Sequence, residues 1–105
     1  MKFMICASYS KEGADAVLKS GSATDRKKVT ATMIKGLGGK MESYYYVSHC
    51  DAYVICDLPN AAAAAAIALK IKASGMGSVT TTLLLDAKEV DDAIALEVKY
   101  GQPGK

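Results

Sequence analysis

Residues 40–57 read KMESYYYVSHCDAYVICD, and this stretch decides the fold class. Apolar and aromatic residues stand on both sides of a short polar break at His49-Cys50-Asp51. Two such runs separated by a few polar residues are typical of a β-hairpin. We therefore expect strands at residues 40–48 and 52–57, joined by a turn at His49-Cys50-Asp51.

A helix is predicted before this hairpin. Val29, Met33 and Leu37 recur at intervals of four residues, which is the apolar stripe of an amphipathic helix. Ser22 or Thr24 can provide its N-cap. The glycine-rich segment 36–39 ends it, because glycine adopts the left-handed conformation of a helix terminus at low cost.

A second helix is predicted after the hairpin. Leu58-Pro59-Asn60 interrupts the strand pattern, and Asn60 is a favourable N-cap. The alanine-rich residues 61–73 have the highest helix propensity of the chain. Their small side chains allow a helix to pack close to a sheet.

Strands are also expected at the two outer ends of this unit. Residues 2–9 are largely apolar, and residues 78–85 (SVTTTLLL) are β-branched and apolar. A short helix is expected near residues 10–19, and a last amphipathic helix is spaced by Val90, Ile94 and Val98. The order β-α-β-β-α-β, followed by a C-terminal helix, predicts an α+β, ferredoxin-like sandwich in a single domain, residues 1–105.

Composition excludes several classes of protein. The chain has 105 residues, half of them apolar, and a net charge of +2. These values indicate a globular protein and give no electrostatic reason to expect nucleic acid or a membrane as a partner. No segment approaches the ~20 apolar residues of a membrane-spanning helix.

The cysteine pattern bears on the cellular compartment. The chain has three cysteines, Cys6, Cys50 and Cys56, and its first residues do not resemble a secretion signal. An odd number of cysteines in a non-secreted chain predicts reduced thiols. We therefore expect all three cysteines to be free, Cys6 and Cys56 to be small core residues on adjacent strands, and the protein to be cytoplasmic.

Several strings of the chain resemble the GYD domain family of small bacterial and archaeal proteins. The resemblance covers about residues 2–95. Its more specific strings are the strand that begins at Asp51 and ends near Pro59, and Val79-Thr-Thr-Thr-Leu83. The commoner strings are Ser10-Lys-Glu-Gly13, Leu37-Gly-Gly-Lys-Met41 and Ser43-Tyr-Tyr45. The resemblance implies a ferredoxin-like fold that is usually assembled as an oligomer, and it implies no particular reaction.

The tripeptide that gives this family its name is only partly present. Its counterpart in this chain is His49-Cys50-Asp51, so Asp51 alone matches. This segment is also where His, Cys and Asp coincide. A metal site needs about four converging ligands, which three adjacent residues cannot supply. A polar turn, a ligand-contacting loop and a Cys50–His49 nucleophilic pair remain alternatives, and the turn is the one we favour; we expect no metal and no cofactor.

Aromatic residues surround this turn. Tyr44, Tyr45 and Tyr46 suggest base stacking, but the neighbouring strands lack the basic residues of an RNA-binding sheet. The glycine-rich turns match no phosphate-binding loop. Arg26-Lys27-Lys28 is interpreted as a solvated helix face, with anion contact as the alternative. The candidate ligand-binding residues are Tyr44, Tyr46, His49, Asp51 and Tyr53, and no catalytic residue can be named.

Strand alternation predicts an open apolar face. Side chains alternate between the two faces of a sheet. The face expected to meet the helices carries Phe3, Ile5, Ala7, Met41, Ser43, Tyr45, Val47, Ala52, Val54, Cys56, Val79, Thr81, Leu83 and Leu85. The opposite face carries Met4, Cys6, Ser8, Tyr44, Tyr46, Tyr53, Ile55, Thr80, Thr82 and Leu84.

Monomers rarely expose an apolar patch of that size, so we expect a second chain to cover the opposite face in a two-fold dimer. Coverage by the chain's own C-terminal helix is the competing explanation. The sequence therefore favours a small, self-associating cytoplasmic protein with no identifiable catalytic motif. The alternative is a small-molecule-binding or enzymatic dimeric α+β barrel protein with a sheet-lined pocket.

Overall fold

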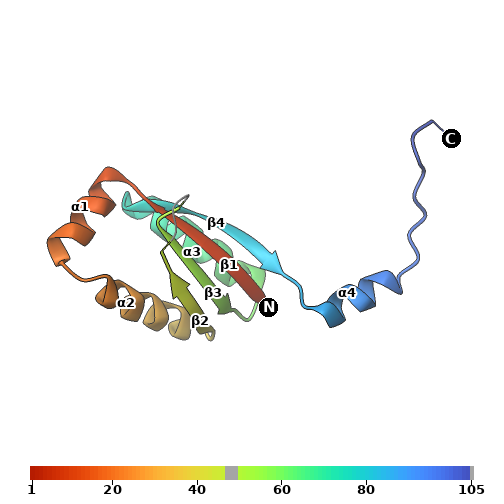
Figure 1. Ribbon diagram of the computed structural model, residues 1–105, viewed down its shortest axis with the longest axis horizontal. Coiled ribbons are helices and arrows are strands. Elements are labelled where there is room, and N and C mark those ends of the chain that lie inside the picture. The colour runs from red at the N-terminus through yellow and green to blue at the C-terminus, as the bar shows by residue number, and fades with distance from the viewer. Residues whose placement is uncertain (47–49, 105) are drawn as a thin grey trace.

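The computed structural model describes residues 1–46 and 50–104, which form an α+β structure with a four-stranded antiparallel sheet (Figure 1). The elements are β1 (Lys2–Tyr9), α1 (Lys11–Ser20), α2 (Ala23–Gly36), β2 (Lys40–Tyr45), β3 (Ala52–Asp57), α3 (Ala61–Ser74), β4 (Gly77–Leu84) and α4 (Ala87–Ile94). The predicted order of strands and helices is therefore present. The strands lie in the order β2-β3-β1-β4, which is consistent with a ferredoxin-like arrangement.

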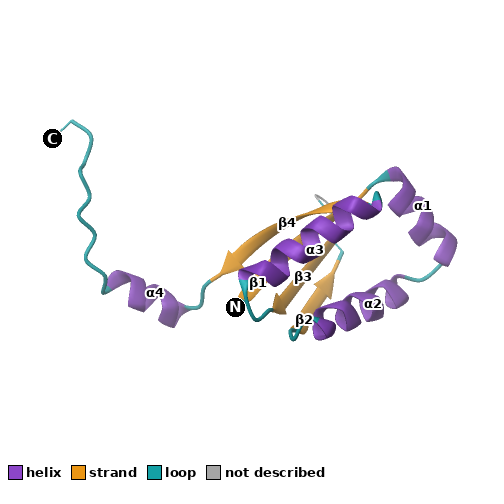
Figure 2. Cartoon of the chain, turned by 180° about the vertical axis from the view of Figure 1, so that it is seen from behind, coloured by secondary structure: helices purple, strands orange, loops and turns teal. Residues whose placement is uncertain are grey.

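Two helices cover one face of the sheet. In Figure 2, α3 crosses the sheet and α2 runs beside it. α3 packs chiefly over β4, and α2 packs over β2 at the other edge. The opposite face carries no helix in either view.

The helices begin at polar caps that the sequence largely identifies. The Ser22 side chain accepts from the backbone N–H of Asp25 at the start of α2, so Ser22 rather than Thr24 is the N-cap. Asn60 caps α3 by accepting from Ala63. Asp86 and Glu89 form a capping box at α4, a device that fixes this helix start although none of the residues of α4 is buried.

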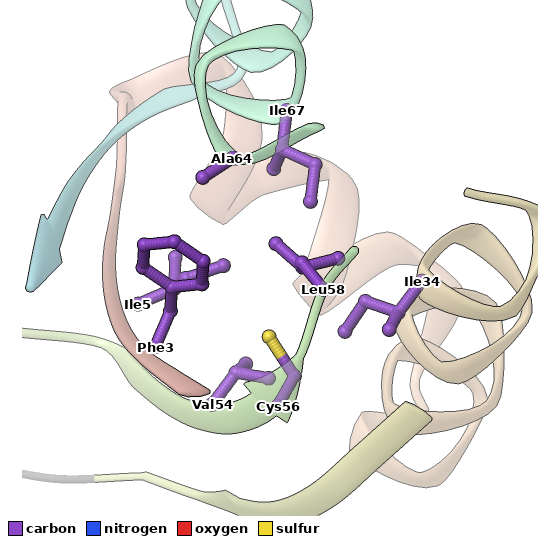
Figure 3. Packing of buried hydrophobic residues seen from close by; sticks show 8 residues of the cluster. All are labelled: Phe3, Ile5, Ile34, Val54, Cys56, Leu58, Ala64 and Ile67. Atoms are coloured by element: carbon purple, nitrogen blue, oxygen red, sulfur yellow. The ribbon is translucent and has the colours of Figure 1, made fainter. Parts of the chain in front are cut away.

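The core lies between the sheet and these two helices. Ile34 of α2 and Ile67 of α3 point toward Phe3, Val54 and other sheet residues (Figure 3). The cluster consists of Phe3, Ile5, Ile34, Val54, Cys56, Leu58, Ala64 and Ile67. The expected inward face of β1 and β3 is therefore confirmed, and so is Cys56 as a small core residue.

The expected face is confirmed for Met41, which packs against the core, but the expected faces of β2 from Ser43 onward are wrong because this strand contains a β-bulge. Its register shifts between Met41 and Ser43, so Ser43 pairs with Ile55 and Tyr44 pairs with Val54. One extra residue reverses the alternation beyond it. Tyr44 therefore lies on the helix-covered face with Val54.

Tyr45 lies on the open face as a result of the same bulge. It pairs with Tyr53 and is 67% exposed. Glu42, at the bulge, forms an ion pair with Lys2 of β1, with 2.8 Å between Nζ and Oε2. The two faces predicted for β2 are therefore exchanged after the bulge, at residues 43–45.

Two predicted element ends also differ. β2 ends at Tyr45 rather than at residue 48. Residues 47–49, which comprise the end of the predicted strand and the first residue of the predicted turn, lie outside the described residues. α4 ends at Ile94, so Val98 is not helical although it continues the apolar spacing. Spacing alone does not hold a helix together where no surface packs against it.

The prediction of three reduced cysteines is wrong for this structure. Cys6 and Cys50 form a disulfide, with 6.2 Å between their Cα atoms, and Cys56 is the free cysteine. The physical reason is the sheet register: Cys6 pairs with Tyr53 near the start of β3, which brings Cys50 beside it. The expectation of a reducing compartment rested on three free cysteines, so the disulfide removes its support.

The C-terminal segment projects from the rest of the chain. In Figure 1, α4 and the residues after it extend beyond the end of β4 and do not return to the sheet. None of the residues of α4 is buried. The radius of gyration is 17.1 Å, and the longest extent is 59 Å; a chain of about 100 residues folded on itself has roughly 13 Å. The competing idea that α4 covers its own open sheet face is therefore wrong.

A candidate small-molecule cavity

A cavity of about 220 Å³ lies between the sheet and helices α2 and α3, beside the core. Its walls are mostly apolar and come from all four strands of the sheet and from both helices. Ile5, Ile34, Val54 and Ile67 belong to both the core cluster and this cavity. The complete lining is Ile5, Ala7, Ser8, Tyr9, Arg26, Val29, Thr30, Met33, Ile34, Tyr44, Ala52, Val54, Ile67, Ile71, Ser74, Met76, Gly77, Ser78 and Val79.

Three tyrosines meet at one end of this cavity. The Tyr44 hydroxyl lies 3.4 Å from the Tyr46 hydroxyl, and the two rings pack edge to face with centroids 5.6 Å apart. Tyr9, at the end of β1, lines the cavity with Tyr44 and interacts with both of these hydroxyls. We call Tyr9, Tyr44 and Tyr46 the tyrosine cluster.

Two hydroxyls of the tyrosine cluster, those of Tyr44 and Tyr9, favour the neutral form. Burial raises the pKa of Tyr44, and hydrogen bonding with Tyr46 and Tyr9 raises it further. Burial is likewise the largest cause that raises the pKa of Tyr9, while the Arg26 charge acts in the opposite direction. Tyr44 and Tyr9 therefore present hydrogen-bond donors, not phenolates, at neutral pH.

Arg26 stands at the same end of the cavity. It lies one turn into α2 and is half-buried, whereas Lys27 and Lys28 are exposed. Arg26 and Tyr9 also line a second hollow of about 250 Å³ under α1, so they lie between the two spaces. The interpretation of residues 26–28 as a uniformly solvated face is therefore wrong for Arg26.

The candidate residues from the sequence fall in different places. Tyr44 lines the cavity. Tyr46 does not line it, but its hydroxyl contacts that of Tyr44. Asp51 is not in the lining; its carboxylate accepts from the backbone N–H of Tyr9 at 2.7 Å. Tyr53 is on the open face, paired with Cys6 and Tyr45. His49 lies outside the described residues.

Sequence reasoning missed Tyr9 and Arg26 as site residues. The position of each residue in the sequence pattern could have indicated that it faces the cavity. Tyr9 shares the strand parity of Phe3 and Ile5, which places it on the helix-covered face. Arg26, Thr30 and Met33 share one side of a helix by their spacing of four and three residues, and all three line the cavity.

The described residues offer little nucleophilic or metal chemistry. No group of three or more His, Cys, Asp or Glu side chains within residues 1–46 and 50–104 is placed to hold a metal ion. Burial raises the pKa of the Cys56 thiol, which disfavours the reactive thiolate. Cys50 is held in the disulfide and is not a free nucleophile in this structure.

The fold and the cavity define a small α+β protein with an apolar, tyrosine-edged pocket under its helices. The chain belongs to the GYD domain family, whose model matches residues 3–94. No curated protein and no solved structure matches it. Across the part of the chain that the structure describes, no helix combines the length and the apolar character needed to cross a membrane.

Proposed function

We propose that this protein binds a small, largely apolar molecule in the cavity between its sheet and helices α2 and α3. The observation that carries the proposal is the cavity itself, where apolar walls meet three tyrosines at one end. Ligand sites generally combine an apolar lining with a few convergent polar groups. The proposal takes the fold to be ferredoxin-like. In such a fold the pocket lies between the layer of strands and the layer of helices.

The cavity volume limits the size of the ligand. An apolar cavity of about 150 Å³ accommodates benzene, whereas pockets for drug-sized ligands measure about 300–1,000 Å³. At about 220 Å³, this cavity suits one aromatic ring or a short aliphatic chain. Larger cofactors do not fit within these walls.

Toluene is a suitable probe because it has an apolar body and no polar head. Toluene is expected to shift the methyl resonances of Ile67, Ile71 and Val79 in the NMR spectrum of the full chain. The Val79→Phe variant should abolish these shifts, since the larger side chain fills the cavity from β4.

The matched control is Leu83→Phe. Leu83 lies on the same strand and the same face, opposite Phe3, but it does not line the cavity. The control variant should bind toluene like the unmutated protein. Toluene that leaves the cavity methyl groups unshifted, or that binds equally well to Val79→Phe, would contradict the proposal.

We further propose that the protein works as a homodimer whose subunits meet through the open sheet face. That face carries Met4, Tyr45, Tyr53, Ile55 and Leu84, by the observed strand pairing. It is apolar and aromatic, and none of the helices in the described part of the chain covers it. Contiguous apolar surfaces of this kind mark interaction sites.

The projecting C-terminal segment supports a second copy as the partner. Its apolar side chains are exposed, including Ile94 at 76%, Leu96 at 70% and Val98 at 78%. Each chain has an apolar arm and an open apolar face. In a symmetric dimer, the arm of one copy can cover the open face of the other. Both lose their contact with water when two copies associate.

Sedimentation equilibrium at micromolar concentration tests the dimer. The unmutated protein should sediment at twice the 11.0 kDa mass of one chain. Ile55→Glu should shift it toward the single-chain mass, because a charge would be buried at the interface. Leu18→Glu, on the exposed side of α1, is the matched control and should leave the mass unchanged. A single-chain mass for the unmutated protein would contradict the proposal.

A further inference from the structure

The cavity lining contains one charged residue, Arg26, to which the proposed apolar ligand gives no role. Of the residues that line the cavity, Arg26 alone carries a formal charge, and no Asp or Glu is among them. Within residues 1–46 and 50–104, the ion pairs join Lys2 to Glu42, Lys11 to Asp15 and Lys88 to Asp92. Arg26 is therefore a half-buried guanidinium without a carboxylate partner in the described chain.

A half-buried cation without a counter-ion is unfavourable, and a ligand can supply the missing charge. A guanidinium offers five N–H donors and no acceptor, in a planar fork that matches a carboxylate. The tyrosine cluster adds hydroxyl donors at the same end of the cavity, and the raised pKa of Tyr44 and Tyr9 keeps them protonated. Donors and positive charge thus converge where the apolar walls end.

We propose that the ligand is a small organic acid, with a one-ring or short aliphatic body in the cavity and a carboxylate bound by Arg26 and the tyrosine cluster. This inference rests on the proposed function, because it names the ligand class of the same cavity. Arg26 is only half-buried, so a carboxylate paired with it keeps some contact with water. Pairing with Arg26 therefore costs less desolvation than a fully buried ion pair.

Benzoate and benzamide test the proposal because they have nearly the same shape and differ in charge. Benzoate should bind the unmutated protein at least tenfold more tightly than benzamide in calorimetric titrations. Arg26→Gln should remove that preference. Tyr44→Phe should weaken benzoate more than toluene, because only the carboxylate uses the hydroxyl.

Two further variants support the assignment to Arg26. Lys27→Gln, at the exposed neighbouring position, should leave benzoate binding unchanged. Arg26→Lys should retain part of the preference, because it keeps the charge but loses the planar fork. The comparison of benzoate with benzamide on the unmutated protein stands even where a variant fails to fold.

The outcomes separate the two proposals. Equal affinities for benzoate and benzamide, together with bound toluene, would overturn the organic-acid class and leave the cavity as a binding site. Unchanged benzoate affinity in Arg26→Gln would overturn the role of Arg26 and hence this inference. Failure of toluene and of both acid and amide to shift the cavity methyl groups would overturn this inference and the proposed function together.

Discussion

The Asp51 carboxylate accepts a hydrogen bond from the backbone N–H of Tyr9, with 2.7 Å between Oδ2 and N. The Asp51 backbone N–H in turn donates to the Ala7 carbonyl at 2.9 Å. These two bonds join the start of β3 to the end of β1, where Tyr9 enters the tyrosine cluster. Through this contact Asp51 positions Tyr9, which lines the cavity, although Asp51 itself does not.

Asp51→Ala is expected to destabilise the protein by about 1 kcal/mol, because it removes a charge-assisted hydrogen bond to a backbone N–H. Asp51→Asn keeps an acceptor and should cost less. Urea denaturation measures both values. The matched control is Asp91→Ala on α4, where an exposed carboxylate is removed away from the sheet. Equal effects of Asp51→Ala and Asp91→Ala would show that the bond to Tyr9 adds no stability.

The disulfide predicts a specific thiol count. Thiol titration of the denatured, unreduced protein should give one free thiol per chain, from Cys56, and three after reduction. Cys6→Ser with Cys50→Ser should lower the free energy of unfolding by about 2–4 kcal/mol, since the bridge closes a long loop in the unfolded chain. Three thiols before reduction would instead support the expectation drawn from the odd cysteine count.

The tyrosine cluster predicts a loss of stability at alkaline pH. The folded-state pKa of Tyr44 is raised, so its contribution is fully present below the unfolded value near pH 10. That contribution is lost as the pH rises from about 10 toward the folded-state pKa, by up to about 1.4 kcal/mol per pH unit.

Urea midpoints at several pH values between 9 and 11 measure this effect in the unmutated protein and in Tyr44→Phe. The slope should be shallower in Tyr44→Phe, because the variant has no hydroxyl to ionise in the unfolded state. Identical slopes in the unmutated protein and in Tyr44→Phe would refute the prediction.

Most of the fold follows from local patterns, and most of the site does not. Caps such as Asn60 and the alternation of Phe3 and Ile5 are set by neighbours in sequence, so the elements could be predicted. Glu42, at the bulge, forms an ion pair with Lys2 on another strand. A contact between residues so far apart in the sequence cannot be predicted from the alternation of neighbouring residues. One inserted residue was therefore enough to place Tyr44 on the wrong face.

The same reasoning explains the errors at Cys6 and Arg26. Counting cysteines gives no information on which strands bring two sulfur atoms together, whereas the register of β1 and β3 does. The charge of Arg26 resembles that of Lys27 and Lys28 in the sequence. Its burial depends on the sheet that the helix packs against, so only the structure separates it from its neighbours.

Gly77 provides a test of the packing at the closed edge of the cavity. A Cβ atom at Gly77 would collide with the Ser8 carbonyl of the paired strand, so Gly77→Ala should destabilise the protein by about 1–3 kcal/mol. Gly36 ends α2 with open space around it, and Gly36→Ala should be neutral or stabilising by up to about 1 kcal/mol. Thermal unfolding of both variants decides this; equal effects would contradict the packing argument.

The C-terminal arm, residues 87–100, is expected to contribute to the dimer interface and not to the stability of the single chain. Its apolar residues are exposed in the single chain, so their replacement removes no packing from the fold. A variant with serine at Val90, Ile94 and Leu96 should therefore retain the circular dichroism and urea midpoint of an isolated chain, while its dimer dissociates at least tenfold more readily.

The control for the arm replaces its polar residues instead. Serine at Lys88, Asp91 and Asp92 changes as many positions of the C-terminal arm but leaves its apolar residues, so the dimer should persist. Sedimentation equilibrium over a range of concentrations gives both dissociation constants. Because the arm contributes apolar contact only when a partner covers it, equal dissociation constants in the two triple variants would show that the arm lies outside the interface.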